Sequence, residues 1–291
     1  METFYDCIPC FIKQTLDVSR MSSPENEKLH GEILKQAMQE ILNLEMSTPP
    51  PVVASRLHRI IKKMTGNYDP YKVVKDRFNN EALDLYDDLK RLIEDSARPF
   101  ETAVKIAIAG NIIDFGHMPT TQDFDLKKSV KEVLEQNPVI NHIDYLKENI
   151  DKAKKILYIA DNTGEIVFDR VFIEYIMPKK IIYAVRKYPI INDANYEDAE
   201  YVGLTDIVKV IDNGTDVPGT YLQECSLEFK KEFDSADLII SKGQGNYETL
   251  GDEDYNIVFL LRAKCLCVSR DIGCKLNDIV VISKKYVKAA V

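Results

Sequence analysis

The sequence predicts an α/β protein in which a helical N-terminal half precedes a mostly parallel sheet covered by helices on both faces. Two observations support this fold class. Up to about residue 150, the apolar residues mostly recur at helical spacing. After residue 153, short apolar runs typical of buried strands alternate with helical patterns. We therefore expect a helical domain over residues 1–152 and an α/β domain over residues 153–291.

The first half carries four expected helices. Residues 26–44 show an apolar stripe at helical spacing, and the prolines at 49–51 end that helix. A shorter helix is expected over 52–64, and a long one over 71–97. After a proline, the segment 103–113 is nearly uncharged and rich in Ala and Ile, which favours a helix buried between the two halves.

The second half carries six short apolar runs and two longer helical patterns. The runs cover residues 156–160, 181–185, 207–211, 238–240, 257–261 and 279–282. Helices are expected between some of them, at residues 165–177 and 220–233. In an open sheet of this kind, ligands bind at the carboxyl ends of the strands. Candidate site residues should therefore follow the apolar runs directly.

Composition and charge exclude several classes of protein. The 291 residues are 45% hydrophobic and 29% charged, as in ordinary globular proteins. A net charge of −9 argues against nonspecific nucleic-acid binding, which needs dense basic patches. The chain has no long apolar run that would span a membrane and does not begin like a signal peptide. Six cysteines without a secretion signal indicate a soluble, cytoplasmic protein with no disulfide framework.

The first apolar run is followed by candidate metal ligands. Asp161 and Asn162 offer a carboxylate and an amide oxygen, the hard donors that Mg²⁺ or Mn²⁺ prefers. Gly164 permits a tight turn into the next helix, where Glu165 can orient water or contact a substrate. The alternative is that Asp161 or Asn162 only caps that helix.

The second apolar run is followed by a candidate phosphate ligand and a second carboxylate. Arg186 can grip a phosphate with its forked guanidinium, and Asp193 can add an oxygen ligand. Asn192 or Asp193 can equally cap a short helix over 196–201. The turn-rich loop 212–220 after the third run is needed to connect a strand with a helix, and its backbone amides can also line a pocket.

Two further segments complete the candidate site. After the fourth run, Lys242 and Gly243 combine a charged side chain with backbone that can approach an anion, although the P-loop pattern is absent. In the helical half, Asn111 and Asp114 share one face of an apolar helix and can line the cleft between the halves. A structural turn and a satisfied buried asparagine are the alternatives.

Oxygen ligands for a hard cation together with Arg186 and Lys242 fit phosphoryl transfer, where positioning and charge neutralisation dominate. Hydride transfer fits poorly, because no Gly-x-Gly-x-x-Gly follows the first apolar run. Two rival functions stay open. One is an S-adenosylmethionine-dependent methyltransferase, and the other is a protein that binds phosphorylated metabolites without turnover.

These motifs jointly resemble the metal-dependent damage-control phosphatases, a family with an ARMT-like domain once classed as a domain of unknown function. The matching segments cover both halves of the chain, at 110–114, 161–165, 189–194 and 241–248. The segment Asp6-Cys7-Ile8-Pro9-Cys10 is similar to the archaeal and bacterial branch of that family, which carries an N-terminal Cys-x-x-Cys.

The resemblance implies a Rossmann-like three-layer α/β/α domain after a helical N-terminal domain. It implies a divalent metal (Mg, Mn, Co or Ni) on Asp161, Asn162 and Asp193, and a phosphatase acting on sugar phosphates or damaged phosphorylated metabolites. The remaining implied contacts are phosphate on Lys242 beside Gly243 and substrate on Asn111, Asp114 and Glu165. Catalysis is expected from Asp161, Asp193 and Lys242, by activation of water or by attack of Asp161 on phosphorus.

Cys7 and Cys10 allow three interpretations. With Cys265, Cys267 or Cys274 they can form a zinc site if the fold brings them together. They can also form a redox pair, or pack as ordinary free cysteines. The second Cys-x-x-Cys of a typical zinc signature is missing.

Overall fold

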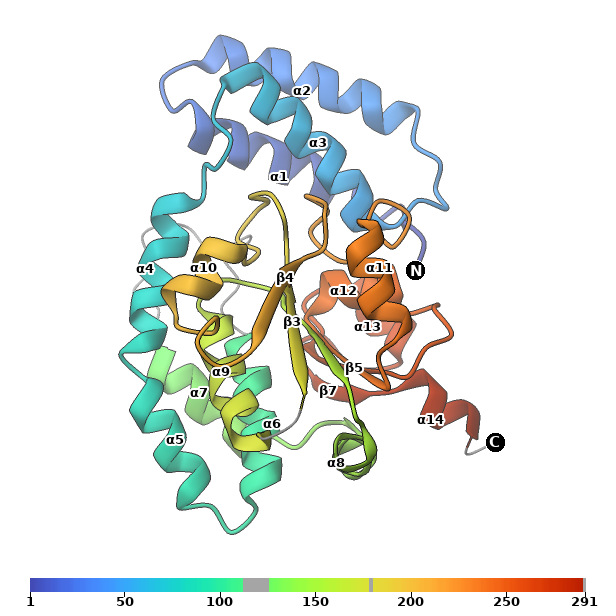
Figure 1. The fold of residues 1–291 in the computed structure, drawn as a ribbon. Coiled ribbons are helices and arrows are strands. Elements are labelled where there is room, and N and C mark those ends of the chain that lie inside the picture. Colours follow the sequence, from blue (N-terminus) through green and yellow to red (C-terminus); the bar gives the residue numbers. More distant parts are fainter. Residues whose placement is uncertain (112–125, 178–179, 290–291) are drawn as a thin grey trace.

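A computed structural model describes residues 1–111, 126–177 and 180–289 of the chain (Figure 1). The helices are α1 (Cys7–Ser22), α2 (Glu27–Leu42), α3 (Pro50–Thr65), α4 (Lys72–Leu83), α5 (Tyr86–Glu94), α6 (Pro99–Gly110), α7 (Leu126–Glu135), α8 (Ile143–Lys152), α9 (Glu165–Ile176), α10 (Tyr196–Tyr201), α11 (Leu227–Asp234), α12 (Gln244–Leu250), α13 (Leu266–Ile272) and α14 (Lys284–Ala289). The strands are β1 (Ile140–Asn141), β2 (Ile156–Ile159), β3 (Ile181–Val185), β4 (Lys209–Asp212), β5 (Leu238–Lys242), β6 (Ile257–Arg262) and β7 (Ile279–Ile282).

Within the described residues, the strands form one seven-stranded sheet in the order β1-β7-β6-β5-β2-β3-β4. Every pairing is parallel except that of β6 with β7. From β2 the chain proceeds to β3 and β4 on one side, whereas β5 and β6 lie on its other side. The strand order therefore reverses between β2 and β5, and a crevice at such a switch point is where open sheets bind ligands.

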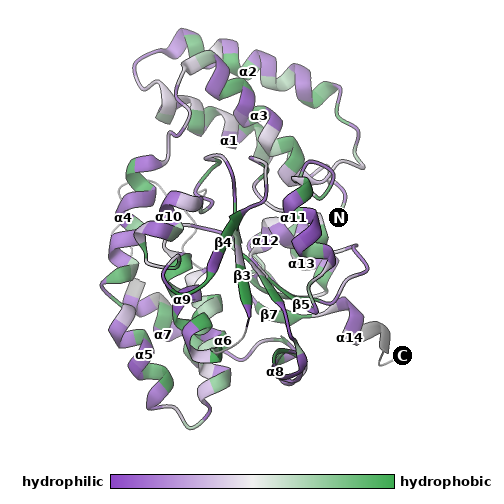
Figure 2. Cartoon of the chain, viewed as in Figure 1, coloured by the Kyte–Doolittle hydropathy of each residue, from purple (hydrophilic) through white to green (hydrophobic). Residues whose placement is uncertain are grey.

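Both faces of the sheet are covered by helices. Successive residues of each strand point to opposite faces, so each strand contributes side chains to both cores. On β2, Ile156 and Tyr158 join the core formed with helices such as α6 and α9. Leu157 and Ile159 join the opposite core with α11, α12 and α13. The strands are mostly apolar, and β3 and β7 are green in Figure 2, whereas β4 carries Lys209 and Asp212 at its two ends. The predicted three-layer, Rossmann-like architecture with a mostly parallel sheet is confirmed.

The first three helices pack mainly on one another. They form two small apolar clusters of their own, around Phe11 and Val53 and around Val18 and Ile33. Figure 1 shows α1, α2 and α3 together above the loops at one end of the sheet. Helices α4 to α9, in contrast, contribute to the large core on one face of the sheet, and β1 pairs with β7. The division at residues 152 and 153 stays a prediction.

The single helix predicted over 71–97 is wrong, since α4 and α5 are separated at Asp84 and Leu85. Leu83 and Leu85 both pack against the large core. Residues two apart cannot share a face of a continuous helix, so the break lets both leucines reach the core. The helix predicted over 220–233 is also shorter, because Ser226 caps its first turn by accepting a hydrogen bond from Phe229 N.

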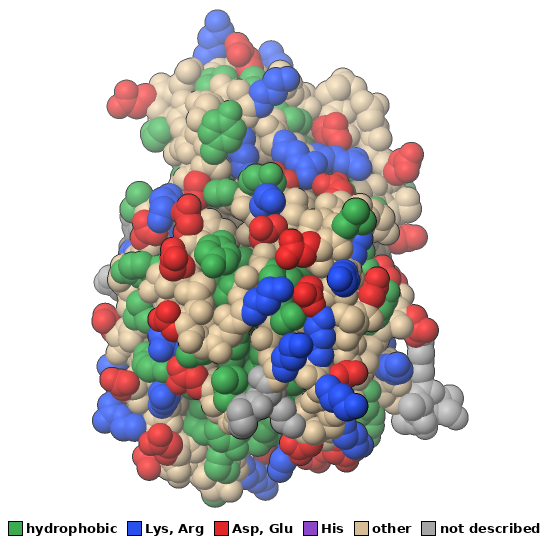
Figure 3. Space-filling model, in the orientation of Figure 1, with side chains coloured by type: hydrophobic (Ala, Val, Ile, Leu, Met, Phe, Trp, Pro, Cys, Tyr) green, Lys and Arg blue, Asp and Glu red, His purple; other side chains and the backbone are tan. Residues whose placement is uncertain are grey.

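In the parts of the chain that the structure describes, no helix is long and apolar enough for a membrane span. On the face drawn in Figure 3, basic and acidic side chains are interspersed. Such mixing of both signs is typical of solvated surfaces.

Candidate active site

A cavity of about 250 Å³ lies at the switch point of the sheet. Its walls come from α1 and α3 and from the loops that follow β2, β3, β4, β5 and β6. The three-helix group therefore covers the carboxyl ends of the parallel strands, and both halves of the sequence contribute to one pocket.

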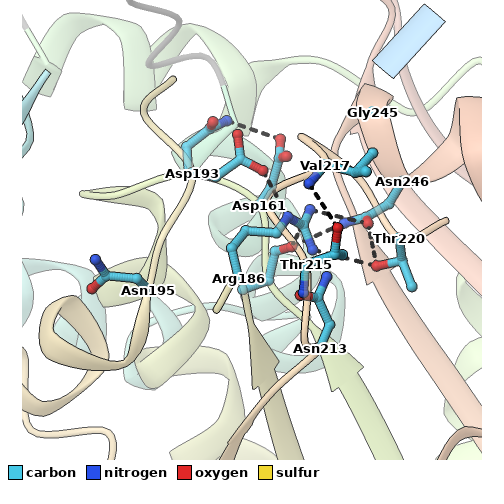
Figure 4. Close-up of polar contacts among 12 residues, drawn as sticks. Asp161, Arg186, Asp193, Asn195, Asn213, Thr215, Val217, Thr220, Gly245 and Asn246 are labelled. Carbon is cyan, nitrogen blue, oxygen red and sulfur yellow. Dashed lines mark hydrogen bonds and ion pairs between the residues drawn. The ribbon is translucent and has the colours of Figure 1, made fainter. Parts of the chain in front are cut away.

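Three predicted metal ligands meet at this cavity. Asp161 and Asn162 follow β2, and Asp193 follows β3, and all three line the cavity. An antiparallel bridge pairs Asn162 with Asp193, while the amide of Ala194 donates to the carbonyl of Asp161 at 2.9 Å. Figure 4 shows the side chains of Asp161 and Asp193 next to each other. The structure brings together three hard oxygen donors from two loops.

The capping alternative does not describe these residues. Helix α9 begins after Gly164, which has a φ of 73° and provides no side-chain cap. Helix α10 is capped by Asn195, which forms a capping box with Asp198. The side chains of Asp161, Asn162 and Asp193 are therefore not used as helix caps.

A second layer of polar residues lies behind the metal candidates. Asn111 Nδ2 donates to Asp161 Oδ2 at 2.9 Å and to Glu165 Oε2 at 3.0 Å. Lys242 is fully buried, and its ammonium donates to Glu165 Oε1 and Asp169 Oδ1, both at 2.6 Å. A third donation goes to the carbonyl of Ala107 at 2.7 Å. These bonds fix the carboxylates of Asp161 and Glu165 from behind.

Arg186 fixes the carboxylate of Asp193 from behind in the same way. Its Nε donates to Asp193 Oδ2 at 2.8 Å, and its remaining nitrogens donate to Asn246 Oδ1 at 3.1 Å and Thr220 Oγ1 at 3.3 Å. Asn246 in turn donates to the carbonyls of Ala160 and Lys242. Arg186 is nearly fully buried, so its guanidinium is committed to holding the loops in place.

The electrostatics of the site fit a bound cation. Burial, together with repulsion from Glu165 and Asp193, raises the pKa of Asp161 well above its usual range. Burial likewise raises the pKa of Asp193 to about 6, although Arg186 works against this increase. Buried carboxylates that repel one another are costly unless a positive charge compensates them. Oxygen donors in such a setting suit a hard divalent ion such as Mg²⁺ or Mn²⁺.

The raised pKa of Asp193 predicts a pH dependence of metal binding. Metal ligands must be deprotonated, so Mn²⁺ affinity should fall as the pH is lowered through about 6. Below that pH we expect a loss of about tenfold per pH unit, measured by calorimetric titration between pH 5 and 8. An affinity that does not vary across this range would contradict the role of Asp193.

Gly243 is required for the position of Asp161. It has a φ of 78°, and an added Cβ would lie 1.8 Å from Asp161 Oδ2. We expect Gly243→Ala to displace the Asp161 carboxylate and reduce kcat/KM by about 10²-fold, since small misplacements have effects of that size. The matched control is Gly31→Ala on exposed α2, where nothing lies within 4 Å, and this change should leave activity unaltered. Equal activity of Gly243→Ala and Gly31→Ala would contradict the requirement for glycine at position 243.

Sequence reasoning missed Lys264, which lines the cavity directly after β6. Its positive charge lowers the pKa of Asp161, opposing burial and the neighbouring carboxylates. The signal was present, because β6 is parallel to β5 and its carboxyl end reaches the same edge of the sheet. Applying the strand-end rule to this fifth apolar run finds Lys264.

The predicted substrate and phosphate contacts do not reach the cavity wall. The described residues that line the cavity do not include Asn111, Glu165, Arg186, Lys242 or Gly243. Each lies behind Asp161 or Asp193, as described above, and their assignment as substrate or phosphate contacts stays a prediction. Asp114 lies outside the residues that the structure describes.

The site combines buried oxygen donors with a lysine, and it lies at the switch point of the sheet in a three-layer α/β/α fold. These features define the class of protein as an α/β enzyme with a candidate cation site. The chain belongs to the family of damage-control phosphatases with an ARMT1-like domain, whose model matches residues 3–280. The predicted class of enzyme, a phosphatase, is thereby confirmed. Enzymes of this family generally depend on a metal ion. The assignment to the branch with an N-terminal Cys-x-x-Cys stays a prediction.

Individual relatives match over nearly their whole length. The uncharacterized protein MJ0202 of Methanocaldococcus jannaschii is 38% identical over 290 residues, which cover 96% of this chain and 94% of that protein. Damage-control phosphatase PH1575 of Pyrococcus horikoshii is 34% identical over 292 residues, with 98% and 99% covered. The crystal structure of PH1575, a DUF89 family protein, gives a TM-score of 0.89 at 33% identity, covering 97% and 99% of the two chains.

Proposed function

We propose that this phosphatase hydrolyses phosphate monoesters of small metabolites, such as sugar phosphates or damaged phosphorylated metabolites, with a divalent cation on Asp161, Asn162 and Asp193. One observation carries the proposal. Loops after two neighbouring strands place these three oxygen donors on the wall of one cavity, among carboxylates that repel one another. A cation removes that repulsion and attracts a phosphate.

The residues suit the cation chemically. Carboxylate and amide oxygens are the donors of Mg²⁺ and Mn²⁺ sites, and Co²⁺ or Ni²⁺ can take the same ligands. When bound, such an ion polarises a phosphoryl oxygen and lowers the pKa of coordinated water. Which of the four ions is used depends on affinity and supply, because oxygen donors alone discriminate weakly.

The side chains divide into contacting and positioning groups. Asp161 lines the cavity, and two amides hold its Oδ2, at 2.9 Å from Asn111 and 2.8 Å from Asn162, so its carboxylate is oriented to accept the proton of an attacking water. Glu165 and Lys242 lie behind it and keep this geometry fixed. Lys264 lines the cavity and supplies the positive charge that phosphoryl transfer needs.

The cavity limits the substrate. About 250 Å³ accommodates a small phosphorylated molecule. The α1 and α3 side of the cavity presents Phe11, Pro51 and Ala54, whereas the strand ends present the carboxylates and Lys264. We propose that the phosphate faces the strand ends and that the carbon skeleton lies against α1 and α3.

Hydrolysis of p-nitrophenyl phosphate tests the function. Protein stripped with EDTA should be inactive, and adding Mg²⁺, Mn²⁺, Co²⁺ or Ni²⁺ one at a time should restore turnover with at least one ion. A panel of sugar phosphates and nucleotides then ranks the substrates by kcat/KM. Turnover that persists in EDTA, or the absence of turnover with every ion and substrate, would reject the proposal.

Lys264→Met separates phosphate binding from folding. Removing a cation that faces the transferring phosphoryl group should reduce kcat/KM by about 10²-fold or more. Lys264 is only partly buried at the cavity wall, so the melting temperature should change by no more than a few degrees. The matched control is Lys13→Met, which alters another cavity lysine, on α1, that pairs with Asp17. Comparable kinetics of the two variants would remove Lys264 from the mechanism.

The two rival functions that the sequence left open, a methyltransferase and a binding protein without turnover, do not fit the phosphatase family to which the chain belongs. The absence of nucleic-acid partners and a cytoplasmic location stay predictions from net charge and cysteine content.

A further inference from the structure

Four of the six cysteines lie on the wall of the cavity, although they come from opposite ends of the chain. They are Cys7 and Cys10 at the start of α1, and Cys265 and Cys267 at the start of α13. The hydrolysis proposed above uses none of these thiols. Their convergence therefore needs a separate explanation.

One pair of thiols lies in contact, and it joins the two ends of the chain rather than the two cysteines of the Cys-x-x-Cys segment. Cys7 Sγ lies 4.0 Å from Cys267 Sγ, and the two residues are 260 positions apart in the sequence. Cys10 is exposed, whereas Cys7 is half-buried and Cys267 is buried. A disulfide needs sulfur atoms about 2.05 Å apart, so the two sulfurs must approach each other by about 2 Å.

Other contacts tie the N-terminal segment to α13 and to the neighbouring α12 region. Asp6, directly before α1, pairs with Arg270 of α13 at 2.9 Å. The N-terminal ammonium group donates to the carbonyl of Glu248 at 2.9 Å and pairs with Asp252 at 2.8 Å. These contacts limit how far the two thiols can separate, and a small, constrained separation favours pairing over reaction with other partners.

We propose that Cys7 and Cys267 form a disulfide when the protein meets a peroxide, and that this bond joins α1 to α13 at the cavity wall. The reaction is balanced with hydrogen peroxide as oxidant. The thiolate of Cys7 attacks the O–O bond, which gives a sulfenic acid and releases hydroxide. The Cys267 sulfur then attacks the sulfenic sulfur, the S–S bond forms and water leaves. Two electrons pass from the two sulfurs to the peroxide.

The surroundings keep the pair reduced in the absence of excess oxidant. Burial raises the pKa of the Cys7 thiol to about 12, with smaller contributions from Cys267 and Glu248. A protonated thiol is a poor nucleophile, so the bond should form slowly and only at high peroxide concentrations. Once formed, it encloses almost the whole chain in one covalent loop and restricts the unfolded state.

Peptide mapping of the full-length protein tests the pair. The chain is reduced, stripped of metal with EDTA, desalted, treated with hydrogen peroxide and digested with trypsin without reduction. Trypsin places Cys7 and Cys10 in the peptide 1–13 and the two α13 cysteines in the peptide 265–270. The expected product is a disulfide between these two peptides, together with a melting temperature several degrees higher that returns to its original value with dithiothreitol.

Serine variants assign the bond. The crosslink should disappear in Cys7→Ser and Cys267→Ser and persist in Cys10→Ser and Cys265→Ser. Cys274→Ser, outside the cavity, is the control for general effects of substitution. A bond within peptide 1–13, or oxidation without a crosslink, would overturn the proposal. Mapping of the unaltered chain gives this answer even if a variant fails to fold, and none of these readouts depends on phosphatase activity.

Discussion

Asp161→Asn is expected to reduce phosphatase activity by about 10³-fold while leaving the metal-free fold at least as stable as the original. The substitution keeps the shape and the acceptor oxygen that Asn111 and Asn162 use. It removes the charge that binds the cation and accepts a proton. The measurement is kcat/KM at saturating Mn²⁺, together with thermal melting in EDTA.

The stability result follows from the sign of the pKa shift. Burial and the neighbouring carboxylates Glu165 and Asp193 raise the folded pKa of Asp161 above the value of 3.8 for a free side chain. The unfolded chain therefore loses the proton first, and the original protein loses stability as the pH rises above about 4. Asp161→Asn lacks this loss, so its advantage in melting temperature should grow with pH.

With Mn²⁺ the original protein should become more stable than Asp161→Asn, because a ligand that binds only the folded state stabilises that state. The ion should raise the melting temperature of the original protein and leave Asp161→Asn unchanged. Asp17→Asn, which alters another cavity carboxylate that pairs with Lys13, is the matched control and should retain full activity. Full activity of Asp161→Asn would rule out a role for this carboxylate.

Lys242→Met is expected to unfold the protein or to lower its melting temperature by about 10 °C. Lys242 is fully buried and donates to two buried carboxylates, Glu165 and Asp169. Breaking a buried ion pair by removing one partner costs about 3–5 kcal/mol, because the remaining charges are left uncompensated. In a chain of this size about 1 kcal/mol shifts the melting temperature by about 2–4 °C.

The same variant distinguishes the two roles of Lys242. A lysine that only contacts phosphate can be replaced at little cost in stability, as expected for Lys264→Met. Lys187→Met, at a half-exposed lysine near Asp212, controls for the loss of a positive charge. Normal melting of Lys242→Met combined with lost activity would favour the direct phosphate contact.

Much of the fold was predictable because it depends on local patterns. Apolar runs mark β3 and β7 at their observed bounds, and the strand-end rule finds Asp161, Asn162 and Asp193. The break between α4 and α5 was not predictable, because it arises from Leu83 and Leu85 meeting one distant core. Local periodicity contains no information about such a core.

The roles of the buried cations also depend on tertiary contacts. Arg186 and Lys242 follow strands as a phosphate ligand would, yet Asp193 and Asp169 occupy them in the folded chain. Asp169 lies within α9, and no motif points to it. The approach of Cys7 to Cys267 likewise depends on the start of α1 packing beside α13, which sequence spacing does not encode.

Calorimetric titration of the EDTA-stripped protein with Mn²⁺, repeated for Asp193→Asn, tests most directly whether Asp161, Asn162 and Asp193 share one cation. We expect one ion per chain for the original protein and at least tenfold weaker binding for the variant. Unchanged stoichiometry and affinity in Asp193→Asn would contradict the proposed site.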